Sequence, residues 1–327
     1  MLVLFGADEQ LLPLAKRYLI PIRYTVPVFL FTQFLSAFLR NDSDPQLTTK
    51  AVLSGGAFNV IGDYLLVFTF DMGIFGAGLA TAISSIVSLL VMMTHFLRRT
   101  NTLKFVRPVR FPQQGRRIIA TGFSTFFIDI AMGMLTMLFN RQIMRYFNAD
   151  ALAVYGIIVN IGTFVQCCAY GVGQAVQPIL SINYGARKRD RIVLLIRYSM
   201  VAVFAISCAW VALTQLFPKG FVRLFMVPTA SVLEIAPAII RTYCLSFIFL
   251  PLNIFSTYYF QSVMRPSYSF IISVARGIAL SGLSILAFPA IFGGDALWFA
   301  MPVTELVVAV FVGVSMVRSI GKLSGSD

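Results

Sequence analysis

Long apolar runs separated by short polar gaps follow one another along the chain of 327 residues. A helix needs about 20 predominantly apolar residues to cross the hydrocarbon core of a bilayer. Runs that meet this length lie at residues 12–40, 51–70, 74–96, 118–147, 151–182, 193–217, 232–264, 268–292 and 296–317. The pattern therefore predicts an all-α polytopic membrane protein with nine transmembrane helices.

The composition agrees with a membrane protein. Hydrophobic residues make up 58% of the chain and charged residues 12%, whereas soluble domains carry roughly 25% charged residues. The formal net charge of +13 invites a nucleic-acid interpretation. Most lysines and arginines lie in the gaps between apolar runs, where charge sets membrane topology. We therefore expect the lipid bilayer, and no nucleic acid, as a partner.

Cysteine and histidine are scarce and show no metal-ligand spacing. The four cysteines all lie inside apolar runs, and the single histidine is His95. We expect small core thiols, no disulfide framework and no resident cofactor. The cysteines are Cys167, Cys168, Cys208 and Cys244.

The basic gaps alternate with gaps that are poor in lysine and arginine, and this predicts the orientation. The richest basic gaps are residues 98–117 and 187–191. Short loops rich in lysine and arginine remain on the cytoplasmic side. The expectation is a multi-pass protein of the inner or plasma membrane, with its N-terminus outside and its C-terminus cytoplasmic.

The longest polar stretch divides three helices from six. We expect residues 1–99 to be the remnant of an N-terminal lobe, 100–117 a cytoplasmic linker and 118–327 a C-terminal lobe of six helices. A weak internal repeat, 18–40 against 243–265, would make the first three helices counterparts of the last three. The chain thus looks like a six-plus-six protein without its first three helices, and parallel repeats of this kind are typical of transporters.

Three polar residues mark the second and third apolar runs. Asn59 and Asp63 are four residues apart, so a helix places them on one face. Thr81 lies in the next run among small residues that allow close helix approach. Because an intramembrane acid is costly, an acid, an amide and a hydroxyl here predict a cation or proton site. The alternatives are a structural hydrogen-bond cluster, or an aspartate near a helix end that reaches water.

Ordered motifs resemble the multidrug and toxic compound extrusion (MATE) transporters over essentially the whole chain. The bacterial DinF-like and MepA-like branch fits best. The motifs are LSAFLRND at 35–42, NVIGDY at 59–64, GIFGAGLAT at 73–81, YG at 155–156, GVGQAVQP at 171–178 and NYGA at 183–186.

The resemblance implies a partial two-lobe fold of the MOP superfamily that contains helices four to twelve of twelve. It implies export of small amphipathic organic cations across the cell membrane against an inward flow of H⁺ or Na⁺. It also carries the family's first-lobe cation site onto Asn59, Asp63 and Thr81. That site uses a further aspartate on the family's first helix, which this chain lacks.

Other polar residues are weaker candidates. Asp129 lies about one turn from the position where some branches carry a second-lobe acid, and a satisfied packing acid is equally compatible with it. Glu305 favours a structural hydrogen-bond role. Gln174 and Gln177 share a helix face and either line a cavity or bridge helices. Arg276 falls within the eighth span, so we expect an acidic partner or snorkelling.

Other functions remain open from the sequence. A lipid-linked sugar flippase of the same superfamily would need a more cationic cavity. A truncated, non-transporting remnant would explain the absent helices. A membrane enzyme is disfavoured because no phosphate loop, nucleophile elbow or clustered metal-ligating site stands out.

Overall fold

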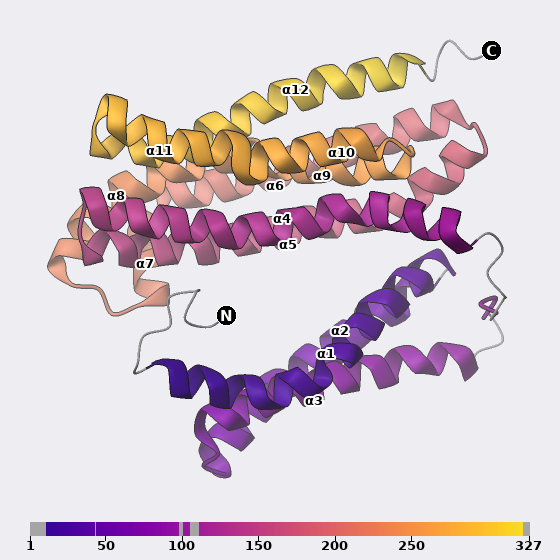
Figure 1. Ribbon diagram of the computed structural model, residues 1–327, viewed down its shortest axis with the longest axis horizontal. Coiled ribbons are helices and arrows are strands. Elements are labelled where there is room, and N and C mark those ends of the chain that lie inside the picture. Colours follow the sequence, from indigo (N-terminus) through magenta and orange to yellow (C-terminus); the bar gives the residue numbers. More distant parts are fainter. Residues whose placement is uncertain (1–10, 43, 98–100, 105–110, 323–327) are drawn as a thin grey trace. The chain divides into compact units, whose positions relative to one another are not determined.

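The computed structural model describes the backbone of residues 11–42, 44–97, 101–104 and 111–322, and their side chains except those of residues 11, 111, 121, 124, 125, 128, 129 and 322. All regular elements in this part of the chain are helices. The chain divides into two compact units, Met1–Pro108 and Val109–Asp327 (Figure 1). Each unit is described by itself.

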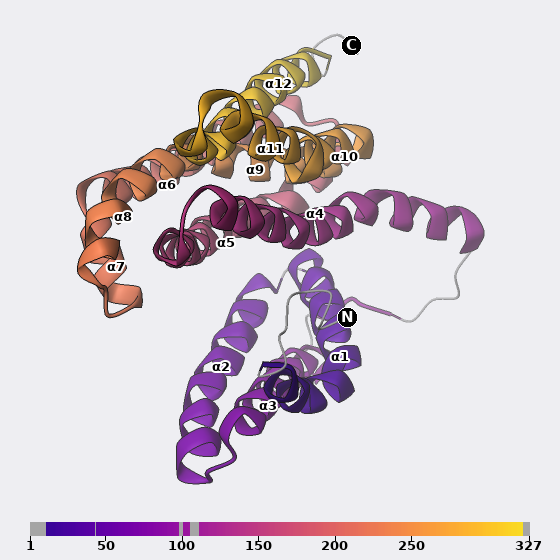
Figure 2. The ribbon, with the colours of Figure 1, turned by 60° about the vertical axis from the view of Figure 1, so that its left-hand side comes forward.

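Unit 1 is a three-helix layer in which α3 packs against both partners (Figure 2). Its long helices are α1 (Leu11–Asn41), α2 (Pro45–Asp63) and α3 (Gly73–Met93), with a π-helical segment η2 (Tyr64–Thr69) after α2 and a 3₁₀ turn η3 (Thr94–Leu97) after α3. The close approach expected from the small residues is confirmed. A Cβ on Gly78 would lie 2.2 Å from the Tyr18 carbonyl oxygen of α1.

Unit 2 is a bundle of helices, the longest of which is α5. It contains α4 (Phe111–Tyr146), α5 (Ala149–Gly185), α6 (Arg189–Leu216), α7 (Pro218–Phe225), α8 (Ala230–Tyr243), α9 (Leu250–Ser262), α10 (Pro266–Val274), α11 (Leu280–Phe292) and α12 (Ala300–Lys322). Helix α5 packs against α6, α8 and α9, while α4 packs against α10 and α11 (Figure 1). The apolar core of the unit is built largely from α5, α8 and α9.

Short irregular segments divide two of the spans of unit 2 and begin a third. A 3₁₀ segment, η4 (Cys244–Ile248), joins α8 to α9, and a π segment, η5 (Ala275–Ala279), joins α10 to α11. The 3₁₀ segment η6 (Gly294–Phe299) precedes α12. The η4 break follows from Pro251 at the start of α9, because proline has no N–H and disfavours helix in the residue before it.

The observed spans agree with the apolar pattern and are mostly a few residues longer. Eight helical stretches of the described residues are long and apolar enough to cross a membrane. The remaining expected span, 118–147, coincides with α4. Helix α2 starts six residues before its apolar run because Asp44 caps it, accepting a hydrogen bond from the Leu47 N–H at 3.3 Å. The short helix α7 was not predicted.

The side-chain burial fits helices that face lipid. Many bulky apolar residues are exposed, among them Phe204 (69%) and Leu224 (74%), and apolar exposure of this extent indicates contact with an apolar solvent or partner. The expectation of four core cysteines is wrong. Cys244 is buried, whereas the other three thiols are exposed on helix surfaces, where a small apolar residue also fits.

A polar cluster closes one end of unit 1, where Asp42, Asp44 and Thr102 lie outside the candidate membrane spans and His95 lies in the last turn of one. The fully buried ring of His95 places Nε2 2.6 Å from Asp42 and Nδ1 3.0 Å from Asp44. Asp42 also accepts hydrogen bonds from the Thr102 hydroxyl and, at 3.0 Å, from the Thr102 N–H. These bonds, the Thr102 hydroxyl first and His95 next, lower the pKa of Asp42 to about 2. The cluster anchors residues 101–104 to the helix ends.

Candidate functional site

The structure brings two of the three predicted unit 1 residues into direct contact. Asn59 on α2 donates from Nδ2 to the Thr81 hydroxyl on α3 at 3.4 Å, a long hydrogen bond. The Thr81 hydroxyl in turn donates to the Ala77 carbonyl oxygen at 3.1 Å, one turn earlier on α3. Asn59 and Thr81 therefore form a polar bridge between two membrane helices.

Asp63 lies one turn beyond Asn59 at the end of α2. Its Oδ1 atom is buried and has no hydrogen-bond partner among the described residues. A buried polar atom without a partner is costly, so its presence calls for a ligand or a proton. Asp63 is the residue of unit 1 whose environment most directly indicates a binding role.

The backbone changes character immediately after Asp63. Residues Tyr64–Thr69 form a π-helical segment, with the Phe70 N–H bonded to the Leu65 carbonyl oxygen at 2.8 Å. Single π turns inside helices occur frequently at functional sites. The chain then reverses through Asp71 and Gly73, both with positive φ (51° and 55°). The irregular segment places Asp63 where a regular α-helix ends.

The oxygen atoms of these three side chains determine which ion they can bind. Asp63 offers carboxylate oxygens, Asn59 an amide oxygen and Thr81 a hydroxyl oxygen. Hard cations such as Na⁺ prefer oxygen ligands, and a proton requires only the carboxylate. Within the described residues no group of three or more His, Cys, Asp or Glu is placed to bind a metal ion. The three oxygen donors themselves suit a monovalent cation, and the carboxylate alone suits a proton.

Unit 2 contains a buried ionic cluster that links three spans. The Nε of Arg276 in η5 donates to Glu305 on α12 at 2.6 Å, and Asn253 on α9 donates to the other Glu305 oxygen at 2.7 Å. Glu305 is fully buried and Arg276 is 7% exposed. The acidic partner expected for Arg276 is thus Glu305. Asn253 was not singled out from the sequence, although an amide inside an apolar run is a detectable signal.

The remaining predicted residues differ in what the structure shows. The Gln177 side chain on α5 donates to the Gln261 side chain near the end of α9 at 3.4 Å, and the Gln177 backbone carbonyl accepts from the Ser262 hydroxyl at 3.5 Å. Gln177 thus bridges two helices. Gln174 also has an interaction partner. The side chain of Asp129 lies outside the described part of the structure.

Comparison with known proteins agrees with this architecture. The MatE family model matches residues 1–65 and 125–281. The multidrug export protein MepA of Staphylococcus saprophyticus is 29% identical over 209 residues, 62% of this chain and 46% of that protein. MepA of a Staphylococcus aureus strain is 23% identical over 311 residues, 94% of this chain and 67% of that protein. The chain thus matches about half to two thirds of the length of these relatives.

Solved structures show the same fold. An outward-facing multidrug resistance MATE family transporter of the MOP superfamily superposes with a TM-score of 0.89 at 20% identity, covering 98% of this chain and 72% of that one. A MOP superfamily transporter from Pyrococcus furiosus gives a TM-score of 0.89 at 18% identity, covering 98% of this chain and 73% of that one. The predicted all-α, multi-pass membrane fold is confirmed.

Proposed function

Because the chain belongs to the MATE family, we propose that it acts in cation-coupled export of small amphipathic organic cations across the cell membrane. The single observation that carries this proposal is the buried Oδ1 of Asp63, which has no hydrogen-bond partner among the described residues and lies one helical turn after Asn59 on α2. The coupling ion is H⁺ or Na⁺. The MepA proteins that the chain resembles are multidrug export proteins.

Binding at Asp63 is the coupling step. A proton or Na⁺ at this carboxylate satisfies the buried oxygen and removes the cost of an isolated intramembrane charge. Because Asp63 directly precedes the π segment η2, a change in its charge acts on the irregular end of α2. The small residues of α3 keep the helices of unit 1 close together, so a shift at α2 is transmitted to α3.

The environment of Arg276 weighs against the flippase alternative. Arg276 lies within a span, where an unpaired guanidinium would attract a phosphate-bearing cargo. Its guanidinium is paired with Glu305 at 2.6 Å and is buried. A paired arginine offers little attraction to a phosphate. Export of cations therefore agrees better with the described charges than movement of an anionic lipid-linked sugar.

The orientation is part of the proposal. The basic gaps, including residues 187–191, lie on the cytoplasmic side and the C-terminus is cytoplasmic. The Asp71 turn then lies on the outer side, and Asp63 is close to the outer end of α2.

The test is dye efflux from a drug-sensitive bacterial host that expresses this 327-residue chain, with and without Asp63→Asn. The matched control is Asp71→Asn, because Asp71 is exposed and asparagine tolerates its positive φ. We expect efflux from cells with the unaltered chain and with Asp71→Asn, and loss of efflux with Asp63→Asn.

Two results would overturn the proposal. Efflux that persists unchanged in Asp63→Asn would remove Asp63 from the coupling step. A membrane-inserted chain that supports no efflux would make the non-transporting remnant the better account. Membrane insertion is checked by the amount of protein in the membrane fraction.

A further inference from the structure

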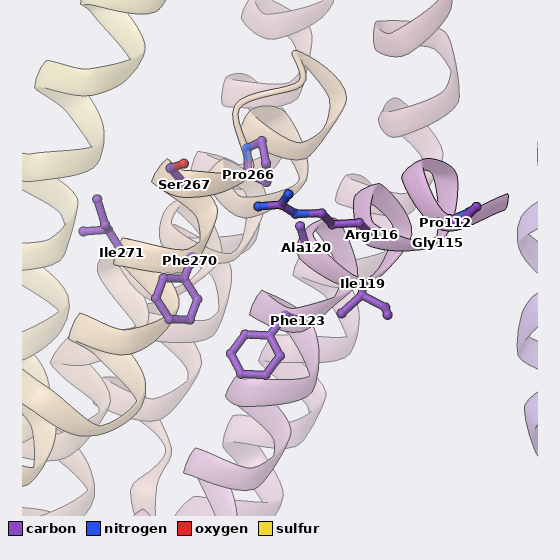
Figure 3. Close-up of a pocket in the computed structure, with 10 residues that line it drawn as sticks. All are labelled: Pro112, Gly115, Arg116, Ile119, Ala120, Phe123, Pro266, Ser267, Phe270 and Ile271. Atoms are coloured by element: carbon purple, nitrogen blue, oxygen red, sulfur yellow. The ribbon is translucent and has the colours of Figure 1, made fainter. Parts of the chain in front are cut away.

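An open pocket lies between the first turns of α4 and the start of α10 in unit 2. Its volume is about 760 Å³, within the range of roughly 300–1,000 Å³ that is typical of small-molecule sites. Figure 3 shows side chains from both helices around it. No step of the proposed export function uses this pocket.

The inner part of the pocket is aromatic and aliphatic. The Phe123 ring of α4 and the Phe270 ring of α10 lie 5.8 Å apart between centroids (Figure 3). Both rings remain partly exposed, at 45% and 38%, and the neighbouring Ile119 and Ile271 are exposed by 69% and 49%. An apolar surface of this kind accepts a hydrocarbon chain.

The mouth of the pocket is polar and cationic. Arg116 extends from α4 toward Pro266 and Ser267 at the beginning of α10 (Figure 3). The pocket is lined by one cation and no acid. Arg116 has no ion-pair partner among the described residues. Its guanidinium is therefore available to an anionic group, and Ser267 supplies a hydroxyl donor beside it.

The arrangement of a cationic mouth above an apolar interior matches the shape of an amphipathic anion. Phe123 is seven residues after Arg116, about 10 Å further along α4 at 1.5 Å per residue. A headgroup held by Arg116 would therefore place an attached chain on the two phenylalanine rings. Amphipathic cations, the substrates of the proposed export, would meet like charge at Arg116, which costs affinity.

The geometry points to a binding site for an anionic phospholipid, with its phosphate at Arg116 and Ser267 and one acyl chain on Phe123 and Phe270. Basic pockets between membrane helices recognise such headgroups. The site uses none of the residues assigned to coupling, so it would bind lipid whether or not the chain exports drugs. Its bound lipid would hold the start of α4 against α10.

The site is tested by native mass spectrometry of the purified chain in detergent, with phosphatidylglycerol and phosphatidylcholine of identical acyl chains. A photoreactive acyl chain on each lipid locates the contact by peptide mapping. The variants are Arg116→Gln, the charge-preserving Arg116→Lys, and the matched control Arg191→Gln. Arg191 is likewise an exposed arginine at the start of a long helix, α6.

We expect retention of phosphatidylglycerol over phosphatidylcholine, with cross-links in residues 112–123 and 266–271. Arg116→Gln should weaken phosphatidylglycerol binding about tenfold or more, because a charge-assisted hydrogen bond is lost. Arg116→Lys and Arg191→Gln should keep most of the preference. Far-UV circular dichroism shows that each variant is folded.

Several results would overturn the site. Equal binding of the two lipids, or cross-links confined to other segments, would show general lipid contact. Displacement of the lipid by inorganic phosphate alone would identify a site for free phosphate. Displacement by the cationic dye ethidium would assign the pocket to the exported substrate.

Discussion

Removing the carboxylate of Glu305 should destabilise unit 2 strongly. Glu305 is fully buried and receives hydrogen bonds from Arg276 at 2.6 Å and from Asn253 at 2.7 Å. In Glu305→Gln the arginine keeps its charge in a buried position and loses its counter-charge. The glutamine carbonyl still accepts one hydrogen bond, so the loss is electrostatic more than steric.

The expected magnitude follows from the burial of both partners. Breaking a buried ion pair by removing one partner costs about 3–5 kcal/mol, because the other charge stays uncompensated. We expect Glu305→Gln to lower the free energy of unfolding by an amount near the lower end of this range, about 3 kcal/mol. Arg276→Met together with Glu305→Gln removes both charges and should recover at least about 2 kcal/mol of that loss.

The assay is unfolding in mixed micelles by increasing SDS, followed by tryptophan fluorescence. Both tryptophans of the chain, Trp210 in α6 and Trp298 in η6, belong to unit 2, so the signal reports the unit that contains the ion pair. The matched control is Glu234→Gln on the exposed face of α8, which should change stability by less than about 0.5 kcal/mol.

A loss of stability in Glu305→Gln no greater than that in Glu234→Gln would contradict this prediction. A double variant as unstable as the sum of the two single variants would contradict it as well, because that result shows no coupling between the charges. Either outcome would mean that water or lipid headgroups solvate Arg276.

Three further predictions concern unit 1. The Thr102 hydroxyl and His95 lower the pKa of Asp42 from 3.8 to about 2. The Asp42 carboxylate therefore stabilises the fold above pH 3.8, and this contribution is lost as the pH falls toward 2. The difference in Tm between the wild type and Asp42→Asn should shrink over that interval. Gly78→Ala should cost about 1–3 kcal/mol in SDS unfolding followed by far-UV circular dichroism, since its Cβ would meet an α1 carbonyl oxygen, whereas Gly56→Ala, with open space around it, should be neutral or stabilising. Thr81→Val should lower stability by only about 0.6 kcal/mol while reducing the dependence of dye efflux on the cation gradient.

The pattern of apolar runs was sufficient to predict most of the fold. The length of each run identified the membrane spans, and the small residues around Gly78 indicated close packing of α3. Asp44 was not recognised as a cap, so the start of α2 was placed too late. The helix α7 was missed because eight residues are too few for a periodic signal.

Only part of the candidate site could be predicted from the sequence. The spacing of Asn59 and Asp63 on one helix face follows from helical geometry alone. The hydrogen bond between Asn59 and Thr81 depends on how α2 packs against α3, which the sequence pattern does not predict. The pairing of Arg276 with Glu305, 29 residues apart, likewise depends on the fold. The π segment after Asp63 has no sequence signal that we recognise.

The central claim is that Asp63 binds the coupling cation, and carbodiimide labelling of the intact chain tests it most directly. Carbodiimides react with protonated carboxyl groups in apolar surroundings, and mass spectrometry of the peptides identifies the modified residue. We predict labelling of Asp63 under conditions that leave the exposed Asp71 unlabelled, and a decrease on addition of Na⁺ or on raising the pH. Labelling of Asp63 that is absent, or unchanged by both Na⁺ and pH, would contradict the account.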